Sequence, residues 1–275
     1  MWFQSPEYLR WTRLYHLSPE NRDHILALLN IHSGERVLDV GCGSGEFTRY
    51  IALDSAATFT GVDNDPPLID YACSHATGNT SYLLADACRL PFPDGSFDLI
   101  VSHTFFTSVA DPAAAMKEMR RVCKPGGRIA SITPDSFNRI PYSNGHYTDC
   151  PWMDEYRKLK AKLDQRFLEK AMQCISGVVP EEMPYFFATA GLQNVRVYQI
   201  GKFFSLSNAT LCSARRKEYL DLEIEAEKTR VSLLDTNEQQ RYLQLLEVRK
   251  QAFLSGENTA WEWIGGSNLL IMGDN

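Results

Sequence analysis

One short stretch constrains this chain more than any other: an apolar segment, Val37–Val40, runs directly into a glycine-rich turn, Gly41–Gly45. The glycines of the turn alternate with Cys42 and Ser44. Because glycine has no Cβ, it tolerates the positive φ angles of a tight turn and lets a ligand approach the backbone closely. The next apolar run ends at Asp63, where a doubly wound sheet places an acid against ribose hydroxyls, roughly 20 residues further on. The two features together predict that a nucleoside-containing cofactor lies against the turn.

The spacing of the glycines separates this turn from the type that binds nicotinamide dinucleotides. That type reads G-x-G-x-x-G, whereas Gly41, Gly43 and Gly45 read G-x-G-x-G, and Asp39 precedes the first glycine by two positions. A nicotinamide-dependent oxidoreductase therefore stays only a remote alternative.

Further segments extend the pattern in a fixed order. They are Leu84–Ala87, Phe97–Ser102, Ala110–Pro112, Arg120–Cys123 and Lys124–Ile129. With the glycine turn, they resemble the class I S-adenosylmethionine-dependent methyltransferases, and the resemblance covers residues 33–134. Within that superfamily the chain is most similar to the group that includes ubiquinone and menaquinone biosynthesis methyltransferases. The resemblance implies S-adenosyl-L-methionine as cofactor and S-adenosyl-L-homocysteine as product, and leaves the acceptor open.

Helix and strand signals alternate along the chain, which predicts an α/β fold with a parallel sheet covered on both faces. Strands are expected over 36–40, 58–62, 81–84, 97–102, 128–132, 195–200 and 267–272. Pro125–Gly127 marks the end of the helix before the fifth strand. The resemblance implies a Rossmann-like, doubly wound sheet of seven strands, six parallel and the seventh antiparallel, with helical insertions that form a cap.

The same signals divide the chain into six segments. These are an N-terminal helical cap (1–32), the cofactor-binding core (33–134), an insertion with a substrate loop and helix (135–179), a continuation of the core with strand six (180–206), a helical insertion (207–258) and strand seven (259–275). In the family, strand six turns quickly into strand seven, whereas a long helical stretch separates them here. We interpret the 207–258 insertion as a lid over the active site; a dimerisation arm or simple packing is the alternative.

The resemblance implies a role for each residue of the cofactor site. The glycines would let the backbone approach the methionine moiety, and Asp63 would accept both ribose hydroxyls, or would be only a turn acid. Asp39 would receive the amino group through water or brace the loop, while Asp86 would accept from the adenine amino group or serve only in a turn. Asn64 departs from the apolar residue usual in the family. The full predicted set is Asp39, Gly41, Cys42, Gly43, Gly45, Asp63, Asn64, Asp86, Ala87, Ser102 and His103.

The acceptor side of the site has weaker signals. His103 ends the fourth strand, and its reference pKa near neutrality suits a general base, although a cofactor-shaping role is the alternative. Relatives often carry a His-His pair where this chain has Thr107 and Ser108, so acid–base residues cannot simply be inherited. Aromatic side chains that could form an acceptor pocket, or pack in the core or onto the sheet, are Tyr15, Phe105, Phe106, Tyr142, Tyr147 and Trp152.

Composition excludes several other classes. The net charge of −6 and the absence of long basic runs argue against nucleic acid as a partner. The seven cysteines form no C-x-x-C pair and the histidines no zinc-binding pattern, so no metal is expected. The chain shows neither a signal-peptide pattern nor an apolar run of the roughly 18–20 residues that span a bilayer, which predicts a cytoplasmic protein.

We therefore expect a methyltransferase that acts on a small-molecule acceptor. A non-catalytic sensor or scaffold that keeps the cofactor site is the main alternative, because the His-His pair is missing and the helical insertion is long. The acceptor atom and the oligomeric state, monomer or homodimer, are left open by the sequence.

Overall fold

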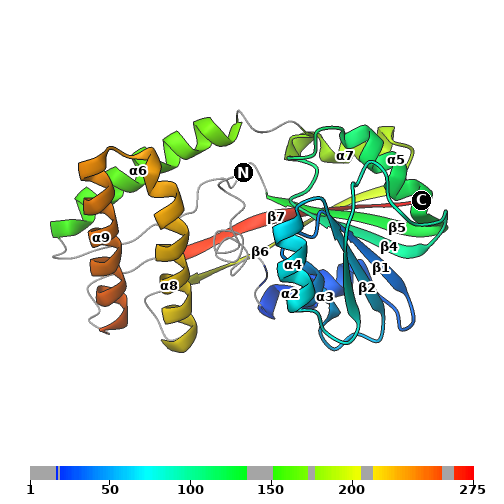
Figure 1. Ribbon diagram of the computed structural model, residues 1–275, viewed down its shortest axis with the longest axis horizontal. Coiled ribbons are helices and arrows are strands. Elements are labelled where there is room, and N and C mark those ends of the chain that lie inside the picture. The colour runs from blue at the N-terminus through cyan, green and yellow to red at the C-terminus, as the bar shows by residue number, and fades with distance from the viewer. Residues whose placement is uncertain (1–16, 18, 135–150, 173–176, 206–212, 256–262) are drawn as a thin grey trace. The chain divides into compact units, whose positions relative to one another are not determined.

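The computed structural model describes residue 17 and residues 19–134, 151–172, 177–205, 213–255 and 263–275 (Figure 1). Its chain forms two compact units. The described residues of the first, here the sheet unit, are 17, 19–134, 177–201 and 267–275. Those of the second, here the helical unit, are 151–172, 202–205, 213–255 and 263–266.

A seven-stranded sheet with the order β3-β2-β1-β4-β5-β7-β6 forms the centre of the sheet unit (Figure 1). Its strands are β1 (Arg36–Val40), β2 (Thr58–Asp63), β3 (Thr80–Leu84), β4 (Phe97–His103), β5 (Cys123–Pro134), β6 (Gln193–Ser205) and β7 (Trp263–Asp274). Strands β1 to β5 pair in parallel, and β7 runs antiparallel to β5. The sheet thus has six parallel strands and one antiparallel strand, which confirms the predicted Rossmann-like, doubly wound fold. The last residues of β6 and the first of β7 belong to the helical unit.

Helices cover both faces of the sheet. They are α2 (Pro19–Leu29), α3 (Glu46–Ala52), α4 (Pro66–Ser74), α5 (Pro112–Val122), the 3-10 turn η3 (Pro180–Glu182) and α7 (Met183–Thr189). Asp65 and Asp111 start α4 and α5 as N-caps, because their carboxylates accept from Leu68 N at 3.2 Å and Ala114 N at 2.9 Å. A proline at the first turn follows each cap, a position where the missing N–H costs nothing.

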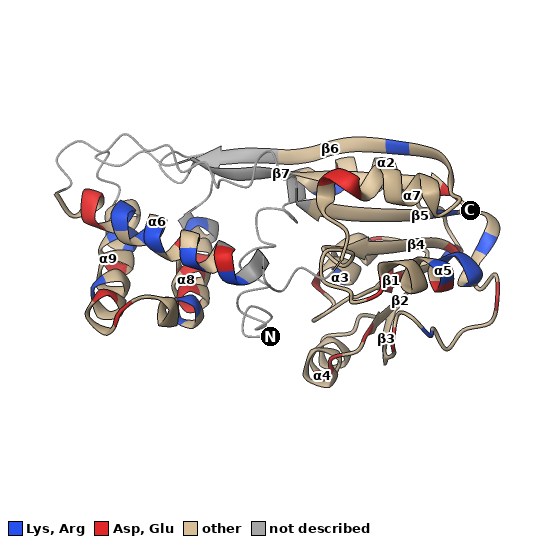
Figure 2. Ribbon diagram, turned by 90° about the horizontal axis from the view of Figure 1, so that it is seen from above, with Lys and Arg blue, Asp and Glu red and all other residues tan. Residues whose placement is uncertain are grey.

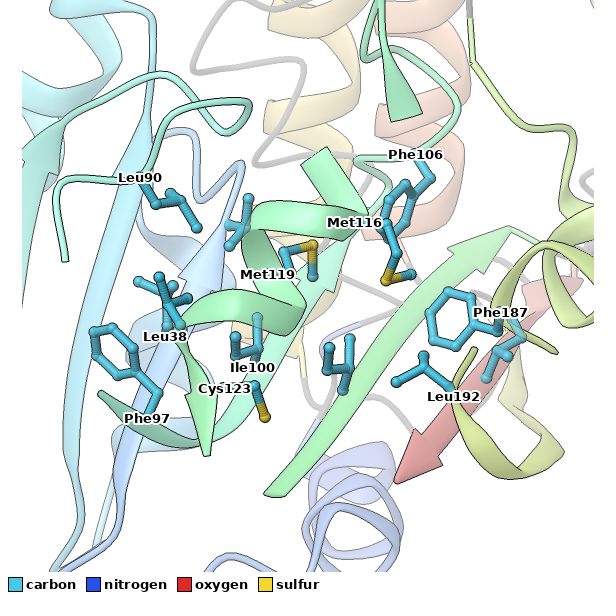
Figure 3. Close-up of a cluster of buried hydrophobic side chains, with 14 of the residues drawn as sticks. Leu38, Leu90, Phe97, Ile100, Phe106, Met116, Met119, Cys123, Phe187 and Leu192 are labelled. Atoms are coloured by element: carbon cyan, nitrogen blue, oxygen red, sulfur yellow. The ribbon is translucent and has the colours of Figure 1, made fainter. Parts of the chain in front are cut away.

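Successive apolar residues of β1 point into two separate hydrophobic clusters. Leu38 and Val40 face the cluster that α5 and α7 complete, part of which Figure 3 shows. Val37 faces the other cluster, to which α2 contributes Ile25 and Leu29. Burial on both faces explains why the strand reads as a continuous apolar run. Helix α2, assigned in the sequence analysis to a cap over 1–32, thus packs against the sheet.

The fifth strand begins earlier than its sequence predicts. Helix α5 ends at Val122, shortly before Pro125–Gly127, as expected. Strand β5 nevertheless starts at Cys123 rather than at Arg128, because Cys123 already pairs with Phe97 of β4. The register then shifts between Phe97 and Leu99, so the Pro-Gly-Gly residues form an irregularity within the strand instead of a turn before it.

The helical unit contains α6 (Pro151–Met172), α8 (Ser213–Arg230), the 3-10 turn η4 (Val231–Leu233) and α9 (Thr236–Leu254). The insertion that the sequence predicts as one helical stretch is thus two helices. The second begins with a capping box, in which Asp235 and Glu238 bond to each other's backbone N–H groups. Apolar residues of these helices pack into one cluster around Tyr156 and Tyr242, whose rings stack at 5.8 Å. The insertion thus forms a hydrophobic core together with α6.

Charged side chains lie inside this helical core as well as on its surface, where acidic and basic residues intersperse (Figure 2). Arg249 pairs with Glu223, and Arg230 pairs with Glu227 at 2.7 Å; all four side chains are buried. Of the described helices, none combines the length and the apolar character needed to cross a membrane.

Candidate functional site

The glycine turn between β1 and α3 adopts backbone angles that side-chain-bearing residues rarely take. The φ angles of Gly41, Gly43 and Gly45 are +74°, +55° and +76°. The N–H groups of Gly41 and Cys42 both donate to the carbonyl oxygen of Val62, at 2.8 and 3.0 Å. These bonds fix the turn to the carboxyl end of β2. All three glycines are therefore required by the backbone alone.

Asp63, at the end of β2, is bonded to the same turn. Its Oδ2 accepts from the N–H of Gly43 at 2.8 Å, and its Oδ1 accepts from the N–H of Asp65 at 3.0 Å. Burial raises the pKa of Asp63, and these two donors offset part of the increase. Each carboxylate oxygen has a second lone pair, so both can accept a further hydroxyl. The structure thus places the predicted ribose acceptor directly beside the predicted glycine turn.

Ser44 is a residue of the turn that the sequence analysis did not select. Its side chain is buried, and its hydroxyl has no hydrogen-bond partner among the described residues. A buried hydroxyl without a partner costs about 1–3 kcal/mol, so a polar group of a bound ligand at this point would restore that loss. Its position between two glycines of the turn is the sequence feature that could have identified it as a site residue. The orphan hydroxyl, the open backbone and Asp63 together fit a polar cofactor.

Two other predicted residues of this region have structural partners. The Oδ2 of Asp39 accepts from the hydroxyl of Thr48 at 2.6 Å, which ties β1 to α3. This bond is the bracing role that the sequence left as one of two alternatives. Cys42 is buried in the turn, and its thiol donates to the carbonyl oxygen of Gly43 at 3.6 Å.

The predicted adenine-side residues lie at the carboxyl ends of β2 and β3. The N–H of Ala85 donates to the carbonyl oxygen of Asp63 at 2.9 Å, which joins the two strand ends. Asp86 follows on the surface, where its Oδ1 accepts from the N–H of Cys88 at 2.9 Å. Ala87 packs against the core, and Asn64 is exposed. The structure thus brings the ribose and adenine candidates to one edge of the sheet.

The end of β4 places His103 in a packed setting. His103 is 6% exposed, and its ring stacks on Phe47 of α3 with centroids 5.2 Å apart. Its Nδ1 lies 3.3 Å from the hydroxyl of Thr104, a residue with a φ of +57°. Ser102 is buried and donates to the hydroxyl of Ser131 at 3.0 Å. These contacts hold the strand end rigid.

The predicted acceptor residues fall in different places. The ring of Phe105 lies where a Cβ of Gly41 would be, so this residue touches the glycine turn. Phe106 is fully buried in the core, where it packs edge-on against Phe186 and Phe187. Trp152 packs in the cluster of the helical unit. The other three candidates, Tyr15, Tyr142 and Tyr147, lie outside the described residues. Phe106 and Trp152 thus have the packing contacts that the sequence left as the alternative to an acceptor pocket.

Metal ligands were not expected in this site. Among the residues that the structure describes, no three or more His, Cys, Asp and Glu side chains come together as a metal site would require.

Comparisons with known proteins agree with this geometry. Residues 38–131 match a family model described as a methyltransferase domain. The demethylmenaquinone methyltransferase of Bacillus pumilus is 28% identical over 183 residues, which cover 63% of this chain and 77% of that protein. The corresponding enzyme of Staphylococcus epidermidis is 32% identical over a shorter match of 115 residues, which cover 40% of this chain and 48% of that one.

Solved structures share the fold at low sequence identity. A protein of Anabaena variabilis, assigned as a methyltransferase of an antibiotic biosynthesis pathway, aligns with a TM-score of 0.59 and 17% identity, over 92% of this chain and 96% of that one. Phosphoethanolamine N-methyltransferase 2 of Haemonchus contortus, solved with S-adenosyl-L-methionine, aligns with a TM-score of 0.51 and 19% identity, over 94% of this chain and 53% of that one.

Proposed function

Because the chain belongs to the class I S-adenosylmethionine-dependent methyltransferases, we propose that it transfers the methyl group of that cofactor to a small-molecule acceptor. The observation that carries the proposal is the bond between the Gly43 N–H and Asp63, which joins the glycine turn to the ribose acceptor. A net charge of −6 disfavours nucleic acid as the acceptor. We further propose a cytoplasmic location.

The chain's own residues would divide the binding of the cofactor among them. The glycine turn and the Ser44 hydroxyl would hold the methionine moiety, and Asp63 would accept the ribose hydroxyls. Asp86 and Ala87 would contact the adenine ring at the adjoining strand end. The adenine contacts rest on the family resemblance and on this position.

The bound cofactor supplies an activated methyl group on a sulfonium, which an in-line displacement transfers. Alignment of the acceptor and exclusion of water are then the main tasks of the protein. The end of β4 suits these tasks, because its backbone is anchored by the N–H of Thr104, which donates to the carbonyl oxygen of Ile132 at 2.8 Å. His103 would shape this wall through its stacking on Phe47. Its role as a general base stays a prediction.

The acceptor class follows from the relatives rather than from this chain. The curated relatives described above are named as demethylmenaquinone methyltransferases. We therefore take hydroquinone and phenol rings as the first acceptors to test. Phe105, whose ring already lies against the glycine turn, is the described aromatic residue best placed to contact such a ring.

A sensor or scaffold without turnover is the second candidate, and one observation favours it. Thr107 and Ser108 stand where relatives often carry a His-His pair, and both hydroxyls turn back to the local backbone, at 3.5 Å from Thr104 O and 3.1 Å from Phe105 O. The turn after β4 is thus stabilised by its own side-chain hydrogen bonds and offers no imidazole at those positions.

One experiment separates the two candidates. Isotopically labelled S-adenosylmethionine is incubated with the protein and a panel of phenol, hydroquinone, amine and thiol acceptors, with Asp63→Ala as the binding-deficient comparison. Label transfer by the wild type, lost in Asp63→Ala, supports the enzyme. Tight binding of S-adenosylhomocysteine by calorimetry, without transfer to any acceptor class, supports the sensor instead.

A further inference from the structure

Tyr82, on the edge strand β3, fills a space that two glycines leave open. Gly61 of β2 pairs with Tyr82 in the parallel register. A Cβ on Gly61 would lie 2.6 Å from Cδ1 of the Tyr82 ring, and a Cβ on Gly45 would lie 2.8 Å from Cε1 and Cζ. Both distances are shorter than any packing contact allows. The ring of Tyr82 can therefore reach the glycine turn only because both positions are glycine.

The backbone of the turn is also held from outside by hydrogen bonds. The Tyr82 hydroxyl donates to the carbonyl oxygen of Gly45 at 3.4 Å. The preceding carbonyl, that of Ser44, accepts from Nη1 of Arg49 at 3.0 Å. Burial raises the pKa of Tyr82, so its hydroxyl stays protonated and able to donate. Two consecutive carbonyls of the turn are thus fixed by side chains from α3 and β3.

We propose that Tyr82 is a positioning residue for the cofactor: its ring holds the glycine turn in the binding conformation, through Gly45 and Gly61, without touching the cofactor. A turn of several glycines loses much conformational entropy when it becomes ordered. A ring that orders the turn before binding removes that cost from the binding step and raises affinity. The proposal also explains Gly61, which lies outside the glycine motif.

This role rests on the cofactor site proposed above, but its structural part can be tested without any cofactor. Amide hydrogen exchange of residues 41–45 in the ligand-free protein reports directly on the order of the turn. Calorimetric titration with S-adenosylhomocysteine then reports the consequence for binding. The two measurements separate a failure of the positioning role from a failure of the cofactor assignment.

Four variants of the protein are compared with one control variant. Tyr82→Val removes the ring and keeps a residue that suits a strand. Tyr82→Phe keeps the ring and removes the hydroxyl. Gly61→Ala pushes the ring away, and the double variant carries Gly61→Ala in the Tyr82→Val background. Phe59→Leu is the matched control, because Phe59 is a buried ring of β2, two positions before Gly61.

We expect Tyr82→Val and Gly61→Ala each to speed exchange across the turn and to weaken S-adenosylhomocysteine binding about tenfold. Tyr82→Phe should bind within about threefold of wild type, because the lost hydrogen bond is long. In the double variant, Gly61→Ala should add less loss than it causes alone, since the part of its effect that requires the ring is gone and only its contact with Sγ of Cys42, at 2.9 Å, is left. With Phe59→Leu, thermal stability should fall while exchange in the turn and affinity are retained.

Three results would overturn the proposal. One is unchanged exchange over residues 41–45 in Tyr82→Val, whatever the cofactor affinity. Another is a loss of affinity in Phe59→Leu equal to that in Tyr82→Val, which would show general destabilisation. The third is full additivity of Gly61→Ala and Tyr82→Val. If the turn loosens in Tyr82→Val and wild type binds no S-adenosylhomocysteine, the positioning of the turn stands and the cofactor assignment fails.

Discussion

Lowering the pH should weaken cofactor binding through one carboxylate, that of Asp63. Burial raises the pKa of this group despite its two backbone donors, so it takes up a proton at a higher pH than an ordinary aspartate. Once protonated, it loses its charge as an acceptor of the two ribose hydroxyls. Charge-assisted hydrogen bonds contribute about 1.5–3 kcal/mol, so affinity for S-adenosylhomocysteine should fall about 10- to 150-fold across the transition.

The same group has the opposite effect on the stability of the ligand-free protein. Because its folded-state pKa is raised, the folded chain binds this proton more readily than the unfolded chain does. The contribution of Asp63 to stability is thus fully present below its unfolded pKa and is lost as the pH rises through its folded pKa. Binding and stability therefore depend on pH in opposite senses at this one residue.

Calorimetric titrations between about pH 7 and about pH 4 test both statements, with thermal unfolding measured in parallel. Asp63→Asn should bind weakly at every pH and lack the acid-side loss of affinity seen in wild type. Asp70→Asn, a change at an exposed acid of α4, serves as the control and should follow wild type. A parallel loss of affinity in wild type and Asp63→Asn would refute the reasoning, because another group would then carry the transition.

Three other outcomes are expected. Ser44→Ala should weaken S-adenosylhomocysteine binding by about 0.5–1.5 kcal/mol in calorimetry and raise the melting temperature of the ligand-free protein, because it removes a buried hydroxyl that has no partner among the described residues. His103→Gln should lower affinity and leave the pH dependence of kcat unchanged if the stacked ring only shapes the wall; loss of the rise in kcat near neutrality would show a general base instead. Glu223→Gln should destabilise the helical unit by about 3–5 kcal/mol in chemical denaturation, because Arg249 keeps a buried charge, whereas the double change Glu223→Leu with Arg249→Met should cost much less.

Local patterns were enough to predict the centre of this site. The run from Val37 to Gly45 contains both the buried strand and the glycines that the turn needs, so the strand and the turn after it could be predicted from this run. Asp63 could be placed because parallel strands bring their carboxyl ends to one edge of the sheet. The spacing of Asp235 and Glu238 is that of a capping box, which marks the start of a helix. This spacing could have predicted that the insertion contains two helices.

Long-range pairing decides what the sequence could not predict. The contact of Tyr82 with the glycine turn depends on its register opposite Gly61, and no spacing within one strand reveals that register. Burial of Glu223 and Arg249 is equally invisible, because alternating charges on a helix normally face water.

The glycines of this chain therefore serve two different purposes, which a motif alone does not separate. All three glycines of the turn have positive φ angles, and Gly45 also makes room for the ring of Tyr82. Gly61 has no positive φ angle and is required by its neighbours, because a Cβ there would lie 2.6 Å from the Tyr82 ring and 2.9 Å from Sγ of Cys42. A substitution at Gly61 should thus become less unfavourable once Tyr82 is small, whereas one at Gly45 should stay unfavourable, since the left-handed backbone alone costs about 1–2 kcal/mol. The difference follows from geometry, and it separates a glycine that a side chain requires from one that the backbone requires.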